Sequence, residues 1–199
     1  VIERLVYHDQ EGKAYEKQEE IPFYKQQTRV ALEDCGRINA ESIKEYIAVG
    51  GYSAVAKALF DMTPQQIVDE ISEASLRGRG GGGFPTGRKW AQVLAQDSEI
   101  KYVVCNGDEG DPGAFMDRSM MEGDPHRVIE GMLIAGIATG AHYGYIYVRA
   151  EYPLAVERLQ TAIQKAEEKG LLGKNILNSG FDFDLKISQG AVSYTHLRA

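Results

Sequence analysis

The sequence has little cysteine, no long apolar run and no excess of basic residues, and each shortage excludes a class of protein. Cys35 and Cys105 are the two cysteines among 199 residues, and neither CxxC nor Cys/His spacing surrounds them. This argues against a disulfide framework or a metal site within the chain. No apolar run reaches the roughly 18 residues that a membrane span requires, so we do not expect a transmembrane protein.

The net charge and the composition of the first ten residues argue against further classes of protein. Twenty-two basic and 29 acidic residues give a net charge of −7, which disfavours a general binder of nucleic acid or of anionic membranes. The first ten residues are mixed and charged and carry no secretion signal. We therefore expect a cytoplasmic protein.

Strand and helix signals alternate along most of the chain. Strands are predicted over residues 101–105, 145–148 and 181–187, the first of them buried and the last with one wet face. Helices are predicted over residues 41–49, 54–60, 64–75, 89–96, 125–140 and 153–169. This order predicts a Rossmann-like parallel α/β sheet that is flanked by helices and joined by right-handed crossovers. A mostly helical or irregular lead-in precedes it.

Two helix starts have capping signals. Thr63, Pro64 and Gln66 have the spacing of a capping box with proline at the first helical position. Asn39 is expected to cap the helix over residues 41–49. His126 and His142 are interpreted as surface or capping histidines.

Residues 77–90, RGRGGGGFPTGRKW, form the most unusual segment, with six glycines between positions 78 and 87. No regular element persists at that density of glycine. The spacing Gly78, Gly80, Gly83 matches the dinucleotide fingerprint, but a helix instead of a strand is predicted before it, and no acidic strand end follows about 20 residues later. A Walker loop is also excluded, because Arg88 stands at the lysine position.

The physical features of this segment still favour phosphate or nucleotide binding. Glycines let backbone amides approach an anion, and a helix that starts at residue 86 or 87 directs its positive end to the same place. Arg79, Arg88 and Lys89 add charge. The alternative is a flexible RGG-like surface segment, against which Phe84 and its neighbours Pro85 and Trp90 argue for a packed loop.

A second polar cluster follows the first predicted strand, at the edge of the sheet where ligands of such folds bind. It has four acceptor residues within six positions: Asn106, Asp108, Glu109 and Asp111. Carboxylates repel phosphate, so this cluster suits ribityl or ribose hydroxyls or the amide of nicotinamide. The alternative is an Asx-rich turn whose glycines set the backbone conformation.

These two segments resemble a known family of flavoproteins, which includes the NADH-oxidising, FMN-binding 51-kDa subunit of respiratory complex I. The family patterns RGRGGxGFPTGxKW and NxDExxPGxxxDR stand here at residues 77–90 and 106–118. The resemblance extends from about Ile21 to Ala191. The residues that fill the second pattern here are more similar to those of the flavin subunits of soluble NAD(P)-linked hydrogenases and formate dehydrogenases than to those of complex I.

The resemblance implies FMN as cofactor, NAD(P)H as substrate and a role for each motif residue. Those that would line the flavin and nucleotide phosphates are Gly78, Arg79, Gly80, Gly81 and Gly83. Lys89 would hold FMN, and Asn106 and Asp108 would contact its ribityl chain or ring. Phe84 would stack on adenine, while Glu109 and Asp111 would face nicotinamide and flavin. Hydride transfer requires no side-chain nucleophile, so no catalytic acid or base is expected.

The resemblance also implies that the chain is a fragment. Residues 1–20 would be the remnant of a linker, 21–75 a helical lead-in, 76–191 a partial FMN- and NAD(P)H-binding domain, and 192–199 a tail outside the family pattern. A four-iron-four-sulfur cluster would bind only in a missing C-terminal region. The partners would be iron-sulfur electron-transfer subunits of a multi-subunit hydrogenase, formate dehydrogenase or complex I.

Two other functions compete with this one. The first is a non-redox module that binds nucleotide or phosphate through the same glycine loop. The second is an RNA-binding RGG-type segment, which the net charge and the presence of a single loop instead of a repeat disfavour.

Overall fold

The computed structural model describes residues 6–111 and 113–190, so the tail predicted over residues 192–199 lies outside the described residues. The chain divides into two compact units, Val1–Glu33 and Asp34–Ala199. In the first unit, β1 (Tyr7–His8) pairs antiparallel with β2 (Ala14–Tyr15), and the 3₁₀ helix η1 (Gln18–Glu20) and the short helix α2 (Pro22–Lys25) follow.

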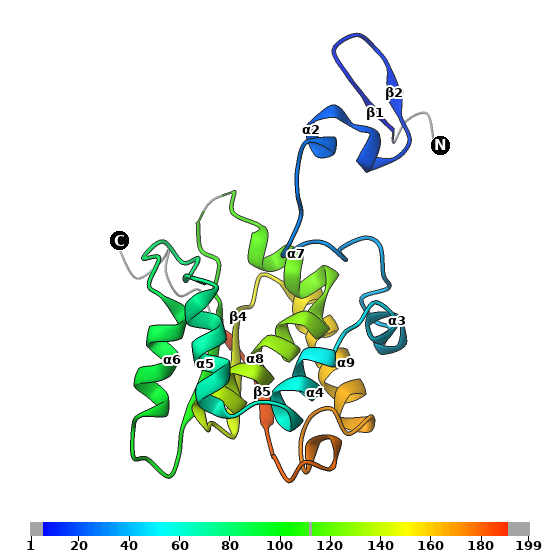
Figure 1. Cartoon of the computed structure of the whole chain (residues 1–199). Helices are drawn as coiled ribbons and strands as arrows, with labels where there is room; N and C mark the ends of the chain where they lie inside the picture. Colours follow the sequence, from blue (N-terminus) through cyan, green and yellow to red (C-terminus); the bar gives the residue numbers. More distant parts are fainter. Residues whose placement is uncertain (1–5, 112, 191–199) are drawn as a thin grey trace. The chain divides into compact units, whose positions relative to one another are not determined.

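The second unit contains a three-stranded parallel sheet in the order β3-β4-β5. Its strands are β3 (Tyr102–Gly107), β4 (Tyr143–Arg149) and β5 (Asp184–Gly190). The helices of this unit are α3 (Ile43–Ala48), α4 (Ser53–Phe60), α5 (Pro64–Glu73), α6 (Thr86–Leu94), α7 (Met116–Gly123), α8 (Pro125–Thr139), α9 (Pro153–Glu168) and the 3₁₀ helix η2 (Ile176–Asn178) (Figure 1). The predicted parallel α/β sheet is confirmed.

Helices cover one face of this sheet. Ile146 and Val148 of β4 are fully buried in one apolar cluster with residues of α8 and α9 such as Leu133 and Leu159. The connections from β3 to β4 and from β4 to β5 advance in the same direction across the sheet. Because such connections are right-handed, their helices lie on the same face of the sheet.

The other face of the sheet is exposed, so the prediction that the first strand is buried is wrong. Tyr102 and Val104 of β3 are 55% and 63% exposed, so β3 is not the fully buried strand that its apolar run predicts. Their register partners on β4, Tyr143 and Tyr145, are exposed as well. In β5, buried Leu185 alternates with exposed Lys186, which confirms one wet face on that strand.

The two predicted helix caps have different outcomes. Thr63 forms the expected capping box with Gln66 at the start of α5. At α3, Ser42 is the cap and accepts a hydrogen bond from the backbone N–H of Glu45, so the prediction of Asn39 is wrong. The Asn39 side chain accepts from Glu41 N–H at 3.0 Å and forms a turn before the helix.

His126 is a core residue, and its interpretation as a surface or capping residue is wrong. Its side chain is 1% exposed, its Nδ1 lies 2.9 Å from the hydroxyl of Tyr52, and its ring stacks on Tyr46. The cap of α8 is Asp124. Burial lowers the pKa of His126 to about 4. His142, by contrast, is exposed, as expected.

We expect acid to destabilise the second unit through His126. Burial, and after it the charge of Lys165, lowers the folded-state pKa to about 4, whereas the usual value is 6.5. Between these values the unfolded state binds more protons, so the free energy of unfolding falls as the pH drops. His126→Asn can keep a hydrogen bond to Tyr52 but cannot titrate. Between pH 7 and 4.5 it should lose about 2 to 3 kcal/mol less stability than the wild type in urea unfolding. Equal losses would contradict the assignment.

Candidate functional site

The glycine loop, residues 77–85, is closed at its base by backbone hydrogen bonds. The N–H of Gly78 donates to the carbonyl of Phe84 at 2.9 Å, and the N–H of Thr86 donates to the carbonyl of Leu76 at 2.8 Å. The loop is therefore a pinned turn between α5 and α6. This geometry argues against the flexible RGG-like alternative.

Glycines in this loop serve two different purposes. Gly81 and Gly83 have φ values of +96° and +57°, a backbone conformation that favours glycine. Gly80 and Gly82 do not have positive φ, and a Cβ atom added at either would find no protein atom within 4 Å. Neither backbone strain nor packing requires glycine at these two positions. The absent side chains leave open space beside the backbone, as the approach of a phosphate requires.

Helix α6 begins directly after the loop because of a close helix contact. A Cβ at Gly87 would lie 2.1 Å from the Oγ of Ser72 on α5 and 2.9 Å from its Cα, so only glycine fits there. The first turn of α6 is thus held against α5. The N–H groups of this first turn that have no partner within the helix point out of its N-terminal end, where the glycine loop lies.

Two cations of this first turn surround an aromatic ring. The guanidinium of Arg88 and the ammonium of Lys89 lie 5.7 and 5.9 Å from the ring centroid of Phe84, which is 40% exposed. Arg79 is exposed on the loop itself. The loop therefore combines open backbone, positive charge and an accessible ring, a set that fits a phosphate joined to a planar group.

The second predicted segment, the acidic loop (residues 106–118), begins at the carboxyl end of β3. The Asn106 side-chain oxygen accepts from the N–H of Asp108 at 3.0 Å, so part of the loop is the predicted Asx turn. This bond uses the oxygen of Asn106 and leaves its amide donors directed elsewhere. Asp108 is half-buried and Asp111 is exposed.

Glu109 is bound within the protein. Its carboxylate accepts from the N–H groups of Asp117 and Arg118 at 3.1 and 3.2 Å, at the start of α7. Tyr152 donates to its carbonyl oxygen at 3.3 Å, and Arg149 donates to the same carbonyl. Burial, with the charge of Glu109 as a smaller cause, raises the pKa of Asp117. The structure thus gives Glu109 an anchoring role that sequence reasoning did not find.

Sequence reasoning also missed Arg149 and Tyr152. They stand 40 and 43 positions after Glu109 in the chain. The available signal was their place at the end of the strand that neighbours β3, since parallel strands bring their carboxyl ends to one edge.

The glycine loop and the acidic loop lie at the same end of the second unit. Figure 1 shows the connection from α5 to α6 and the connection from β3 to α7 together at its top, with the end of β4. In this view the cationic glycine segment and the acceptor segment both lie toward the end of the second unit at which β3 ends.

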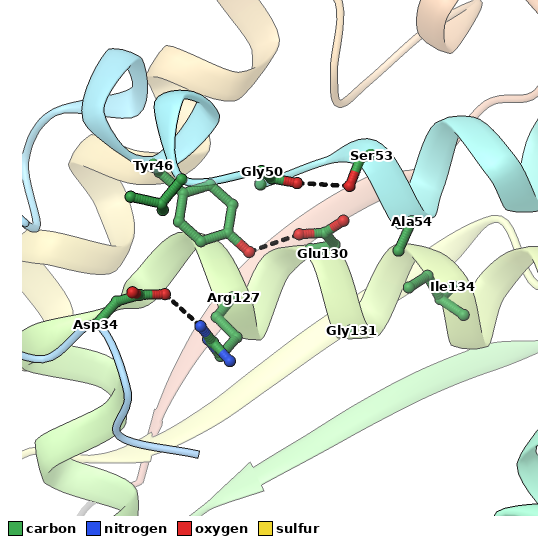
Figure 2. Close-up of a pocket in the computed structure, with 11 residues that line it drawn as sticks. Asp34, Tyr46, Gly50, Ser53, Ala54, Arg127, Glu130, Gly131 and Ile134 are labelled. Atoms are coloured by element: carbon green, nitrogen blue, oxygen red, sulfur yellow. Dashed lines mark hydrogen bonds and ion pairs between the residues drawn. The ribbon is translucent and has the colours of Figure 1, made fainter. Parts of the chain in front are cut away.

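A separate cavity of about 320 Å³ lies where α3, α4 and α8 meet. In Figure 2 the hydroxyl of Tyr46 points to Glu130, to which it donates at 2.5 Å, and Arg127 is paired with Asp34. Burial is the main cause that raises the pKa of Tyr46, and Glu130 adds to it. The predicted site residues do not line this cavity.

Two features of the described residues, 6–111 and 113–190, concern the requirements of a membrane-spanning helix and of a metal site. No helix there combines the length and the apolar character that crossing a bilayer requires. Nor does any group of three His, Cys, Asp or Glu side chains there lie close enough together to bind a metal ion. Cys105 is half-buried, and burial raises its thiol pKa to about 11, so the thiolate is scarce at neutral pH.

Known proteins match most of the chain. The chain is 55% identical over 170 residues to the NADP-reducing hydrogenase subunit HndC of Solidesulfovibrio fructosivorans, which covers 85% of this chain and 34% of that protein. It is 46% identical over 153 residues to the F subunit of the NADH-quinone oxidoreductase of Escherichia coli strain K12, covering 76% and 34%. The chain thus spans about a third of the length of these relatives.

A solved structure agrees. An NAD+-reducing NiFe hydrogenase in its H2-reduced state matches with a TM-score of 0.62 at 30% identity, over 75% of this chain and 25% of that one. The family model described as the Nuo51 FMN-binding domain matches residues 71–196, which include both the glycine loop and the acidic loop. With this match over more than half of its length, the chain belongs to the Nuo51 FMN-binding domain family.

Proposed function

We propose that this chain is the flavin-binding part of an NAD(P)H-oxidising or NAD(P)-reducing oxidoreductase subunit. The observation that carries the proposal is the open space beside Gly80 and Gly82, next to the cationic first turn of α6. The residues of the proposed binding region, 76–191, fall within the second compact unit.

The glycine loop would hold the phosphate of FMN and the pyrophosphate of the nucleotide. Gly78 and Arg79, with Gly80, Gly81 and Gly83, would offer backbone N–H groups and charge, and Lys89 would add a charge-assisted hydrogen bond. Phe84 would stack on adenine. This division agrees with the charges present, because the cations lie on the glycine loop and the first turn of α6, and the carboxylates lie on the acidic loop.

The acidic loop would take the uncharged parts of the cofactor. Asn106 has its oxygen bound to Asp108 N–H and so would offer its amide N–H groups. The carboxylate of Asp108 would accept from ribityl hydroxyls. Exposed Asp111 would face nicotinamide and flavin, while Glu109 would act near them through the loop that it anchors.

When bound, FMN supplies the redox chemistry, exchanging a hydride with nicotinamide. The protein would supply position and electrostatics, so none of its side chains has to act as a nucleophile. Carboxylates beside the flavin ring would disfavour added negative charge on the ring. Cationic side chains beside the phosphates would favour binding of the cofactor. In a protein of the full length of these relatives, electrons would pass from the flavin to iron-sulfur subunits of a multi-subunit hydrogenase, formate dehydrogenase or complex I.

Gly80→Ala tests whether the open space serves a ligand. No protein atom lies within 4 Å of the added methyl group, and the φ of this residue is not positive, so the stability of the ligand-free protein should not change. Loss of close approach to the phosphate should weaken FMN binding by about 10- to 150-fold, the value of one hydrogen bond to a charged group. Flavin fluorescence titration measures the affinity.

Gly131→Ala is the matched control, because a methyl group there also meets no atom within 4 Å, on a helix distant in sequence from the loop. It should bind FMN as the wild type does. Equal affinity of Gly80→Ala and the control would contradict the site. Binding of adenine nucleotide without FMN would instead favour the non-redox module.

Lys89→Ala removes the cation that we assign to FMN. One charge-assisted hydrogen bond contributes about 1.5 to 3 kcal/mol, so the dissociation constant for FMN should rise roughly 10- to 150-fold. Lys57→Ala, which removes an exposed lysine paired with Glu70 on another helix, is the control. An unchanged FMN affinity of Lys89→Ala in calorimetric titration would remove Lys89 from the site.

A further inference from the structure

The acidic loop leaves the sheet where backbone pairing between β3 and β4 stops. The last register pair is Gly107 with Val148, so Glu109 already lies beyond the ladder. The next residue of β4, Arg149, is still paired on its other side with Gly190 of β5. Its backbone is thus fixed while its side chain extends past the end of β3.

Arg149 uses that position to bind the main chain of the loop. Its guanidinium donates to the carbonyl oxygen of Glu109, and it also donates to Glu151 at 3.1 and 3.3 Å. The Arg149 side chain is 19% exposed. The hydrogen bond to Glu151 is the largest cause that raises its pKa, and the negative charge of Asp108 adds to it. The guanidinium therefore binds the main chain at Glu109, and the charge of the proposed FMN ligand Asp108 acts on it.

Tyr152 makes a second attachment to the same residue. Its hydroxyl lies 3.3 Å from the carbonyl oxygen and 3.4 Å from the carboxylate of Glu109, and its side chain is 8% exposed. The guanidinium groups of Arg118 and Arg149 lie 5.3 and 5.4 Å from the centroid of its ring. One buried ring thus connects the end of β4 with the start of α7.

Together these contacts fix Glu109 at two groups, its carbonyl and its carboxylate. Its carbonyl is bound by Arg149 at the end of β4 and by Tyr152 just before α9, and its carboxylate by the N–H groups that open α7. Asn106 and Asp108 precede this fixed point by at most three residues. The main chain of Asn106 is paired with β4 in the sheet, whereas Asp108 follows the last strand pair, and its direction depends on the fixed point at Glu109. Because the N–H of Asp108 donates to the side-chain oxygen of Asn106, the amide of Asn106 is directed by the same contact.

We propose that Arg149 and Tyr152 are positioning residues of the flavin site, which hold the acidic loop so that Asn106 and Asp108 meet FMN. This inference rests on the proposed function. Neither residue has to touch the cofactor. Without these two side chains the main chain at Glu109 is no longer held. FMN binding would then have to order the acidic loop, and the free energy that this ordering costs would weaken the affinity for FMN.

The test compares Arg149→Gln, Arg149→Lys and Tyr152→Phe with two controls, Arg37→Gln and Tyr145→Phe, both at exposed positions. FMN affinity is measured by fluorescence titration, and the visible spectrum of bound flavin and amide hydrogen exchange of the acidic loop are recorded. Thermal unfolding of each protein without FMN separates loss of binding from loss of fold.

We expect Tyr152→Phe to weaken FMN binding about 2- to 12-fold, the value of one neutral hydrogen bond. Arg149→Gln should weaken it about 10- to 150-fold, and Arg149→Lys, which keeps the charge but not the fork of donors, should recover part of the loss. Exchange in the acidic loop should be faster in these variants, and the flavin absorption bands should shift. Both controls should match the wild type.

The possible failures are distinguishable. A wild-type protein that is folded and does not bind FMN overturns the proposed function, and the inference with it. A wild type that binds FMN together with variants that keep its affinity and flavin spectrum overturns the inference alone. If Arg149→Gln does not fold, Arg149→Lys and Tyr152→Phe decide by the same criteria.

Discussion

Parallel pairing of β3 with β4 is the constraint on which the rest of the site depends. It places the ends of two strands side by side although 40 positions separate Glu109 from Arg149 in the chain. Gly107 makes the last pair possible, because a Cβ there would lie 3.0 Å from both the Sδ of Met121 and the carbonyl of Tyr147. This close approach packs Met121 of α7 against the end of β3, and Glu109 binds two N–H groups in the first turn of the same helix.

The two loops divide the work by charge. The glycine loop offers open backbone and cations at the start of α6, and the acidic loop offers an amide and carboxylates after β3. A ligand with an anionic phosphate at one end and hydroxyls and a polar ring at the other matches this arrangement. Each loop is bound at its base: the glycine loop to the start of α6, and the acidic loop to the end of β4.

Local signals in the sequence predicted those parts of the fold that neighbouring residues determine. The capping box of Thr63, the helix that follows Asp124 and the sequence of three parallel strands all depend on short-range patterns. The glycine motif was informative for the same reason, since its close spacing cannot form a helix or strand.

What the sequence did not predict depends on contacts between distant segments. The burial of His126 results from Tyr46 and Tyr52, which are on or next to helices far from it in the chain. The exposure of β3 depends on which elements cover its outer face, and an apolar run contains no such information. Arg149 and Tyr152 were missed because only the sheet brings them to Glu109.

The most direct test of the account is hydrogen exchange of the whole chain with and without FMN. If the two loops form one site, FMN should slow amide exchange in residues 77–86 and in residues 106–118 at the same flavin concentration. Residues that line the cavity between α3, α4 and α8 should exchange as before. Protection of that cavity, or of one loop without the other, would contradict the account.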